Sequence, residues 1–135
     1  MRTVFSSAFT LCALCALGGE LLLLDELMPR QMHPDTLAKK LAAGEPVYLL
    51  DVREPWENEH CRLPDSVLIP LGELTERVSE VEPPAGSTVV VYCHHGIRSL
   101  SGAAILEANG FREAYSLAGG IEAWSTLIDP SVPRY

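Results

Sequence analysis

From about residue 30 onward, two kinds of apolar segment alternate along the chain. Short apolar runs with β-branched residues predict buried strands at 47–52 and 89–92 and a further strand at 67–69. Residues 31–32 are expected to form a short edge strand, and 113–117 a fifth short strand. Segments with apolar residues at helical spacing lie between and after them, at 33–43, 71–81, 99–109 and 120–127, and residues 54–60 can form only a short helix. Because strands alternate with helices, we expect an α/β domain with a mainly parallel sheet and helices on both faces.

The helical spacing also predicts which side chains face the core. The expected inner positions are Leu37, Ala38, Leu41 and Ala42 in the first helix, Leu71, Leu74, Val78 and Val81 in the third, Leu100, Ala103, Ala104 and Leu106 in the fourth, and Ile121, Ala123, Trp124 and Leu127 in the last. Asn109-Gly110 marks the end of the fourth helix. Residues 129–135 follow the last helix with no predicted element.

The 135 residues suit one domain, which we expect to span 28–135 after an apolar segment at 1–27. The net charge of −8 argues against nucleic acid and anionic membranes as partners. The cysteines at 12, 15, 61 and 93 do not resemble a disulfide framework, since the chain has ample apolar residues to fold without one.

The N-terminal segment has the pattern of a secretory signal peptide. Arg2 precedes an apolar run, and Ala16-Leu17-Gly18 resembles a cleavage site. Translation from Met28 or Met32 instead of Met1 is the alternative, and the sequence does not decide between them. The Cys12–Cys15 pair lacks a second pair or a histidine at metal-ligand spacing, so we interpret both as small apolar residues.

Cys93 lies where a reactive cysteine is expected. It directly follows the strand at 89–92 and precedes the helix that begins at Ser99. Open parallel sheets bind ligands beyond the carboxyl ends of their strands. A helix N-terminus favours an anion, and both features stabilise a thiolate. We therefore interpret Cys93 as a nucleophile; the alternative is a small buried core residue.

The loop from Cys93 to Ser99 carries further candidate site residues. Gly96 frees the backbone to turn amides inward, and the loop as a whole is expected to bind the substrate: His94, His95, Gly96, Ile97, Arg98 and Ser99. The two histidines contribute to the reaction or are merely exposed loop residues. Arg98 attracts an anionic donor or is held in an ion pair.

Four motifs in order resemble the single-domain rhodanese family of sulfurtransferases. They are Leu50-Asp51-Val52-Arg53-Glu54, the segment 63–70, the loop Cys93-His94-His95-Gly96-Ile97-Arg98-Ser99, and Leu117-Ala118-Gly119-Gly120-Ile121-Glu122-Ala123-Trp124. The resemblance implies the rhodanese-like fold, a five-stranded, mainly parallel sheet with helices on both faces. It also implies transfer of a sulfane sulfur through a Cys93 persulfide.

The resemblance further implies the partners. The donor is a small anion such as thiosulfate or a persulfide-bearing protein. The end of the chain, 121–135, is similar to rhodanese domains fused to enzymes that adenylate a small sulfur-carrier protein. That similarity favours such a carrier or its adenylating enzyme as partner, and a cytoplasmic location over export. Because the chain has no phosphate-binding glycine loop, we expect a free-standing persulfide carrier; neither a cofactor nor a metal ion is implied.

Two departures and two supporting residues complete the comparison with the family. Cys61 stands in a segment where the family has Gly-His-Ile, so it is either a resolving thiol or a packing or surface cysteine. Asp65 stands where glycine is common. Asp51 and Arg53 resemble family positions near the loop, and they either support the reaction or form an internal ion pair.

Two alternatives to sulfur transfer follow from the same motifs. Rhodanese-like phosphatases have five residues between the cysteine and the arginine, whereas four separate Cys93 from Arg98. The shorter loop suits a sulfur atom better than a phosphate. Some rhodanese domains are non-catalytic binding modules, and the presence of Cys93 argues against that class here.

Overall fold

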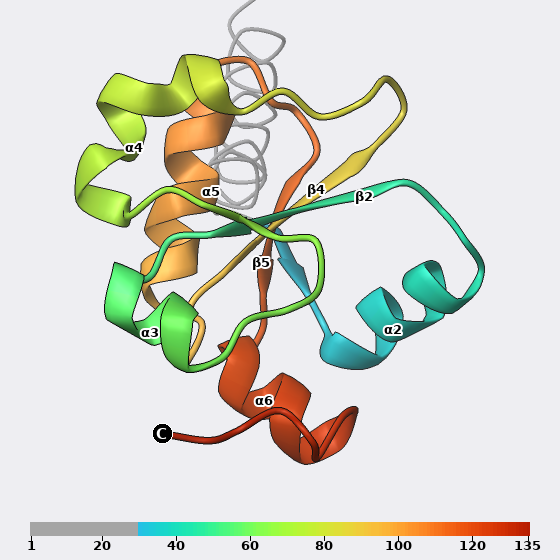
Figure 1. Ribbon diagram of the computed structural model, residues 1–135. Helices are drawn as coiled ribbons and strands as arrows, with labels where there is room; N and C mark the ends of the chain where they lie inside the picture. Colours follow the sequence, from blue (N-terminus) through green and yellow to red (C-terminus); the bar gives the residue numbers. More distant parts are fainter. Residues whose placement is uncertain (1–29) are drawn as a thin grey trace, which may run out of the picture.

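The computed structural model describes residues 30–135 of the chain (Figure 1). Our interpretations of residues 1–27, including the signal-peptide pattern and the Cys12–Cys15 pair, fall outside the described residues. Within residues 30–135, no helix is long and apolar enough to cross a membrane.

Five strands form one sheet in the order β1-β5-β4-β2-β3. Their bounds are β1 Arg30–Met32, β2 Val47–Asp51, β3 Val67–Leu68, β4 Thr88–Tyr92 and β5 Ala114–Leu117. Each of the four strand pairs is parallel. The sequence-based prediction of an α/β domain with a mainly parallel sheet is thus confirmed.

Helices cover both faces of this sheet, as Figure 1 shows. One face is packed by α4 (Leu71–Arg77) and α5 (Arg98–Ala108), and the other by α2 (Pro34–Ala42) and α6 (Gly120–Leu127). The short α3 (Pro55–His60) follows β2. Each face has its own apolar core, because strands buried on both sides carry apolar side chains at successive positions, as Val89, Val90 and Val91 do.

Two details of the helices differ from the sequence-based prediction. The third predicted helix was expected to run to Val81, but it ends at Arg77 and continues as a 3-10 turn over Val78–Glu80. Val81 follows this turn with an extended backbone, at φ −82° and ψ 99°, so it lies outside the helix. Leu127 was expected in the core and is 61% exposed.

The predicted inner faces of α2 and α5 were also partly wrong. Leu41 and Ala42 are exposed, since α2 buries only its first turns through Pro34 and Leu37. Ala104 is exposed as well, because the buried face of α5 carries Gly102, Ala103 and Leu106 instead. A Cβ at Gly102 would lie 2.9 Å from Cγ1 of Val91, so α5 approaches β4 more closely than a larger residue would allow.

The register of the two central strands determines where the site lies. Asp51 of β2 pairs with Tyr92 of β4, and the Val52 N–H donates to the Tyr92 carbonyl at 3.1 Å. The segments that begin at Val52 and Cys93 therefore leave the sheet side by side at its carboxyl edge, where α/β proteins place their ligands.

Candidate active site

Cys93 is the first residue after β4, and its sulfur lies inside the loop that follows. Its Sγ accepts hydrogen bonds from the backbone N–H groups of Gly96 at 3.1 Å and Ser99 at 3.3 Å. The Ser99 hydroxyl lies 3.4 Å from the same sulfur and 2.7 Å from the hydroxyl of Ser116 in β5. Cys93 is only 1% exposed, so the loop surrounds its sulfur with hydrogen-bond donors.

The sulfur of Cys93 also caps the N-terminus of α5. The side chain of Ile97 makes no capping hydrogen bond at the position where Ser, Thr, Asp or Asn usually accepts a first-turn N–H. The Ser99 N–H donates to Sγ instead. Because the first turn is the positive end of the helix dipole, a sulfur anion at this position is stabilised.

The start of α6 holds the loop from the opposite side. The Ile121 N–H donates to the Cys93 carbonyl at 2.9 Å, and the Glu122 N–H donates to the His94 carbonyl at 3.1 Å. Two otherwise unpaired first-turn N–H groups of α6 are thus satisfied by the sulfur loop. This contact gives the Gly119-Gly120 motif a direct role in positioning Cys93.

Glycine is required at two of these positions. Gly120 has a φ of +63°, and a Cβ there would lie 2.5 Å from the Cys93 carbonyl oxygen. Gly96 has a φ of +91°, and its Cβ would lie 2.8 Å from the Gly119 nitrogen. Any side chain at either position would force the loop away from α6.

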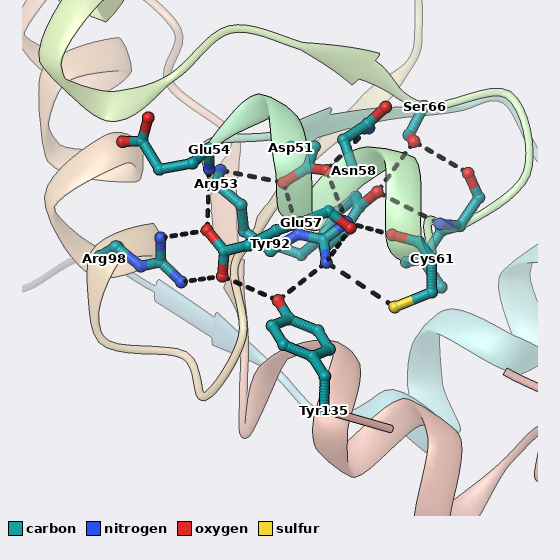
Figure 2. Close-up of polar contacts among 11 residues, drawn as sticks. Asp51, Arg53, Glu54, Glu57, Asn58, Cys61, Ser66, Tyr92, Arg98 and Tyr135 are labelled. Atoms are coloured by element: carbon teal, nitrogen blue, oxygen red, sulfur yellow. Dashed lines mark hydrogen bonds and ion pairs between the residues drawn. The ribbon is translucent and has the colours of Figure 1, made fainter. Parts of the chain in front are cut away.

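Arg98 is held in an ion pair with Glu57 of α3. Its Nη1 and Nη2 donate to Oε2 and Oε1 of Glu57, each at 2.8 Å (Figure 2). These hydrogen bonds from Arg98 lower the pKa of the buried Glu57 carboxyl to about 2. Of the two interpretations of Arg98, the geometry matches the ion pair, and its partner Glu57 was not identified from the sequence.

Asp51 and Arg53 form a second, fully buried ion pair. The Arg53 Nε and Nη2 donate to the two carboxylate oxygens of Asp51 at 2.9 and 2.7 Å. Nη2 also donates to the Cys61 carbonyl at 2.6 Å, and the Asn58 amide donates to Asp51 at 2.9 Å. The geometry matches the internal ion pair interpretation, because both groups are occupied in holding α3 and the segment after it.

Tyr135 joins the two ion pairs, although the sequence predicted no helix or strand over residues 129–135 and assigned no role to Tyr135. Its hydroxyl accepts from Nη1 of Arg53 at 2.9 Å and donates to Oε1 of Glu57 at 2.8 Å. Figure 2 shows Glu57 between Arg98 on one side and Tyr135 on the other. Burial raises the pKa of Tyr135 to about 12, so the hydroxyl keeps its proton and remains a donor.

The two histidines of the loop differ in their surroundings. His94 lies between the His95 and Tyr135 rings, with ring centroids 3.9 Å away in both cases. Its Nε2 has no hydrogen-bond partner within residues 30–135 and lies 3.9 Å from a carboxylate oxygen of Glu122. Burial is the main cause that lowers the pKa of His94. His95 is exposed at the mouth of the site.

Cys61 lies in the core on the other face of the sheet from Cys93. It packs in the cluster beneath α2 and α6, whereas Cys93 belongs to the cluster beneath α4 and α5. Its sulfur is 3.9 Å from Nη1 of Arg53, and both cysteines are free thiols. This placement matches the packing interpretation better than that of a resolving thiol.

A pocket of about 250 Å³ opens above Cys93. It is lined by the loop itself: Cys93, His94, His95, Ile97 and Arg98. A pocket of this size is smaller than the sites that enclose drug-sized ligands. It suits a small ion, or the narrow end of a larger partner, in contact with a sulfur that amides and a helix N-terminus stabilise as an anion.

Comparison with known proteins identifies the family of this chain. The model of the family described as "Rhodanese-like domain" matches residues 33–127. The chain belongs to this family. A sulfurtransferase of Allochromatium vinosum is 35% identical over 98 residues, which are 73% of this chain and 90% of that protein. The family resemblance found in the four motifs is therefore confirmed, and the family supports a role in sulfur transfer.

One further relative by sequence and one solved structure extend the comparison. The probable adenylyltransferase/sulfurtransferase MoeZ of Mycobacterium tuberculosis is 32% identical over 76% of this chain, but the match spans only 26% of that longer protein. The crystal structure of a rhodanese-like domain protein from Staphylococcus aureus aligns with a TM-score of 0.66 at 27% identity, covering 78% of this chain and 98% of that one. The rhodanese-like fold is confirmed by this structure.

Proposed function

We propose that this protein transfers a sulfane sulfur from thiosulfate or a protein persulfide to a thiophilic acceptor, through a persulfide on Cys93. The observation that carries the proposal is the environment of Sγ, which accepts two backbone N–H groups and lies at the N-terminus of α5. Such a site stabilises a thiolate and, after sulfur is added, a persulfide anion.

The reaction has two balanced steps. The Cys93 thiolate attacks the outer sulfur of thiosulfate; a new S–S bond forms, the sulfur–sulfur bond of thiosulfate breaks, and sulfite leaves with its electron pair. A nucleophile such as cyanide then takes the outer sulfur, which gives thiocyanate and restores the thiolate. With a protein persulfide as donor, the leaving group is the donor's thiolate.

For the acceptor, we propose a small sulfur-carrier protein whose activated C-terminal carboxylate becomes a thiocarboxylate. The relative MoeZ supports this class of partner, since its name combines adenylyltransferase and sulfurtransferase. The pocket supports it as well, because an extended chain end is narrow enough to reach a cysteine that is 1% exposed.

Intact-mass analysis tests the persulfide directly. After incubation with thiosulfate, we expect wild-type protein to gain the mass of one sulfur atom and to lose it on reduction. Cys93→Ser is expected to fold and to gain nothing. Cys61→Ala is the matched control and is expected to load as the wild type does, because Cys61 packs on the other face of the sheet. Loading that persists in Cys93→Ser would refute the proposal.

The same variants separate sulfur transfer from phosphatase activity. A phosphate on the nucleophile needs a wider loop and a cation facing it, whereas both terminal nitrogens of Arg98 donate to Glu57. We expect thiocyanate formation and no hydrolysis of aryl phosphates. Aryl-phosphate hydrolysis that disappears in Cys93→Ser would instead support the phosphatase alternative.

The acceptor proposal also depends on location, since sulfur-carrier acceptors of this kind are cytoplasmic. We propose a cytoplasmic location, to be measured by cell fractionation and N-terminal sequencing. A mature chain that begins near Gly19 outside the cytoplasm would refute the carrier proposal. Detoxification of small sulfur compounds or cyanide by an exported sulfurtransferase would then be the better interpretation.

A further inference from the structure

Tyr135 contacts the sulfur loop although it lies far from it in the sequence. Its ring is parallel to that of His94, at an interplanar angle of 11° and a centroid distance of 3.9 Å. The rings of Trp56 and His60 in α3 meet it edge-on at 5.8 and 5.5 Å. The Tyr135 ring is therefore wedged between α3 and the residue next to Cys93.

The segment that carries Tyr135 is itself fixed to α6. The Ser125 hydroxyl donates to the Val132 carbonyl at 2.7 Å, and the Arg134 Nε donates to Glu122 at 2.7 Å. Because α6 also donates two N–H groups to the carbonyls of Cys93 and His94, the segment and the loop share one support.

The Tyr135 hydroxyl reaches the other end of the loop through Glu57. The hydrogen bonds run in one direction along this chain of groups. Arg53 donates to the hydroxyl oxygen of Tyr135, and the hydroxyl donates to Oε1 of Glu57. The same Oε1 also accepts a hydrogen bond from Arg98. Arg98 lies between Gly96 and Ser99, whose N–H groups bond to the sulfur. The orientation of Glu57 thus affects the orientation of the amides that hold Sγ.

We propose that Tyr135 is a positioning residue for sulfur transfer, which holds the Cys93 loop at both ends, through its ring on His94 and through its hydroxyl on Glu57. It does not line the pocket above Cys93 and does not touch the reacting sulfur. This inference rests on the proposed function, because the loop that it positions is the one proposed to carry the persulfide.

Three variants separate the ring from the hydroxyl. Tyr135→Phe keeps the ring and removes the hydroxyl, and Tyr135→Leu removes both. Tyr48→Phe is the matched control, because Tyr48 lies in β2 before the carboxyl edge, and its hydroxyl faces Glu82 rather than the loop. The full chain is used throughout, and melting temperatures establish that each variant is folded at the assay temperature.

Three measurements are made on each variant. The first is the single-turnover rate of persulfide formation on Cys93 as a function of thiosulfate concentration. The second is the rate of Cys93 alkylation by iodoacetamide at neutral pH, followed on the Cys93 peptide by mass spectrometry. The third is the proton chemical shifts of the His94 ring, which a parallel aromatic ring at 3.9 Å moves upfield.

For Tyr135→Phe, we expect the His94 shifts to stay and the saturating rate to fall by about 5- to 10-fold, with KM within about twofold. The fall follows from the loss of the hydrogen bonds of the hydroxyl to Arg53 and Glu57, both charged groups. For Tyr135→Leu, we expect the upfield shift caused by the Tyr135 ring to be lost, while that caused by the His95 ring remains, and the rate to fall by about 20-fold or more. Alkylation of Cys93 should slow in the same order. Tyr48→Phe should match the wild type in all three.

Several outcomes would overturn the inference. Rates and alkylation within twofold of wild type in both Tyr135 variants would do so, as would rate losses that merely follow the fraction of unfolded protein. If wild-type protein does not load sulfur at all, the proposed function fails on its own. Alkylation of Cys93 and the His94 shifts then decide whether Tyr135 positions the loop.

Discussion

The guanidinium of Arg98 binds the carboxylate of Glu57 and is not free to bind a substrate. Both terminal nitrogens donate to Glu57, whose side chain is only 4% exposed, whereas that of Arg98 is 36% exposed. A buried carboxylate that loses its partner is left with an uncompensated charge. At the scale of single residues, the principal role of Arg98 is therefore to hold the loop to α3.

We predict that Arg98→Ala lowers stability by about 2 kcal/mol, less than for a fully buried pair because Arg98 is partly exposed. Sulfur transfer from thiosulfate and from a protein persulfide should weaken to a similar extent. Urea unfolding and kinetics with the two donors measure these effects. A raised KM for thiosulfate alone, with unchanged stability, would show that Arg98 attracts anions instead.

The control for this prediction is another arginine in an exposed ion pair. Arg77 donates to Glu73 and Glu80 on the surface of α4 and the turn after it, with both carboxylates more than half exposed. Exposed pairs contribute about 0 to 1 kcal/mol. Arg77→Ala should therefore leave both stability and sulfur transfer nearly unchanged.

At the scale of elements, two helix N-termini meet at the same loop. The first turn of α5 donates to the sulfur of Cys93, and the first turn of α6 donates to the carbonyls of Cys93 and His94. The loop lies between them because Gly120 has no side chain to separate α6 from it. The fit of α6 against the loop should therefore affect both folding and sulfur chemistry.

We predict that Gly120→Ala costs about 3 kcal/mol or more, because the added Cβ meets two carbonyl oxygens as well as a left-handed backbone. Gly44→Ala is the control: Gly44 has a φ of +73°, but no atom lies within 4 Å of its Cβ position. That variant should cost about 1 kcal/mol from the backbone alone. Equal losses in urea midpoint for the two variants would contradict this reasoning.

For the molecule as a whole, the sequence predicted the elements that follow from local residue patterns. It did not predict the side-chain contacts between segments that lie far apart in the sequence. Strand composition and helical spacing were enough for the parallel sheet, and the chain position of Cys93 after β4 was enough to locate the pocket. The left-handed backbone of Asp65, at φ +57°, also explains why glycine is common there in the family. Asp tolerates this region better than most residues.

The pairing of Glu57 with Arg98, and of Tyr135 with both Arg53 and Glu57, was not predicted. Glu57 is one of three glutamates within six residues, and its local role of accepting the Glu54 N–H at the start of α3 does not point to a partner 41 positions away. Tyr135 lies 78 positions from Glu57 in the sequence. Only the folded arrangement, in which α3, the loop and residues 129–135 meet, selects these partners.

Acid should destabilise the folded protein through Glu57. Its pKa is about 2 in the folded state and near 4.5 when the chain is unfolded, so its stabilising contribution is complete above pH 4.5 and is lost as the pH falls toward 2. The contribution is of the order of 3 kcal/mol, at about 1.4 kcal/mol per pH unit. His94, whose pKa is lowered, adds a loss in the same direction below its ordinary value of 6.5.

Urea unfolding between pH 3 and pH 7 tests this, with Glu57→Gln expected to flatten the acid limb of the stability curve. Glu80→Gln is the control, because Glu80 is exposed and its ion pair is screened by salt. An acid limb in Glu57→Gln as steep as that of the wild type would assign the loss to other groups.

The two ion pairs that hold the site are each neutral, since Asp51 is balanced by Arg53 and Glu57 by Arg98. An anion that diffuses toward the pocket therefore experiences chiefly the field of the whole chain, whose net charge is −8. We therefore expect repulsion to slow the encounter with thiosulfate, and salt to relieve it as the Debye length falls from about 30 Å at 0.01 M to about 8 Å at 0.15 M. The second-order rate constant for sulfur loading should therefore rise over this range with thiosulfate and fall with a basic persulfide-bearing protein. Stopped-flow measurements at the two ionic strengths would show whether this surface favours protein donors over small anions.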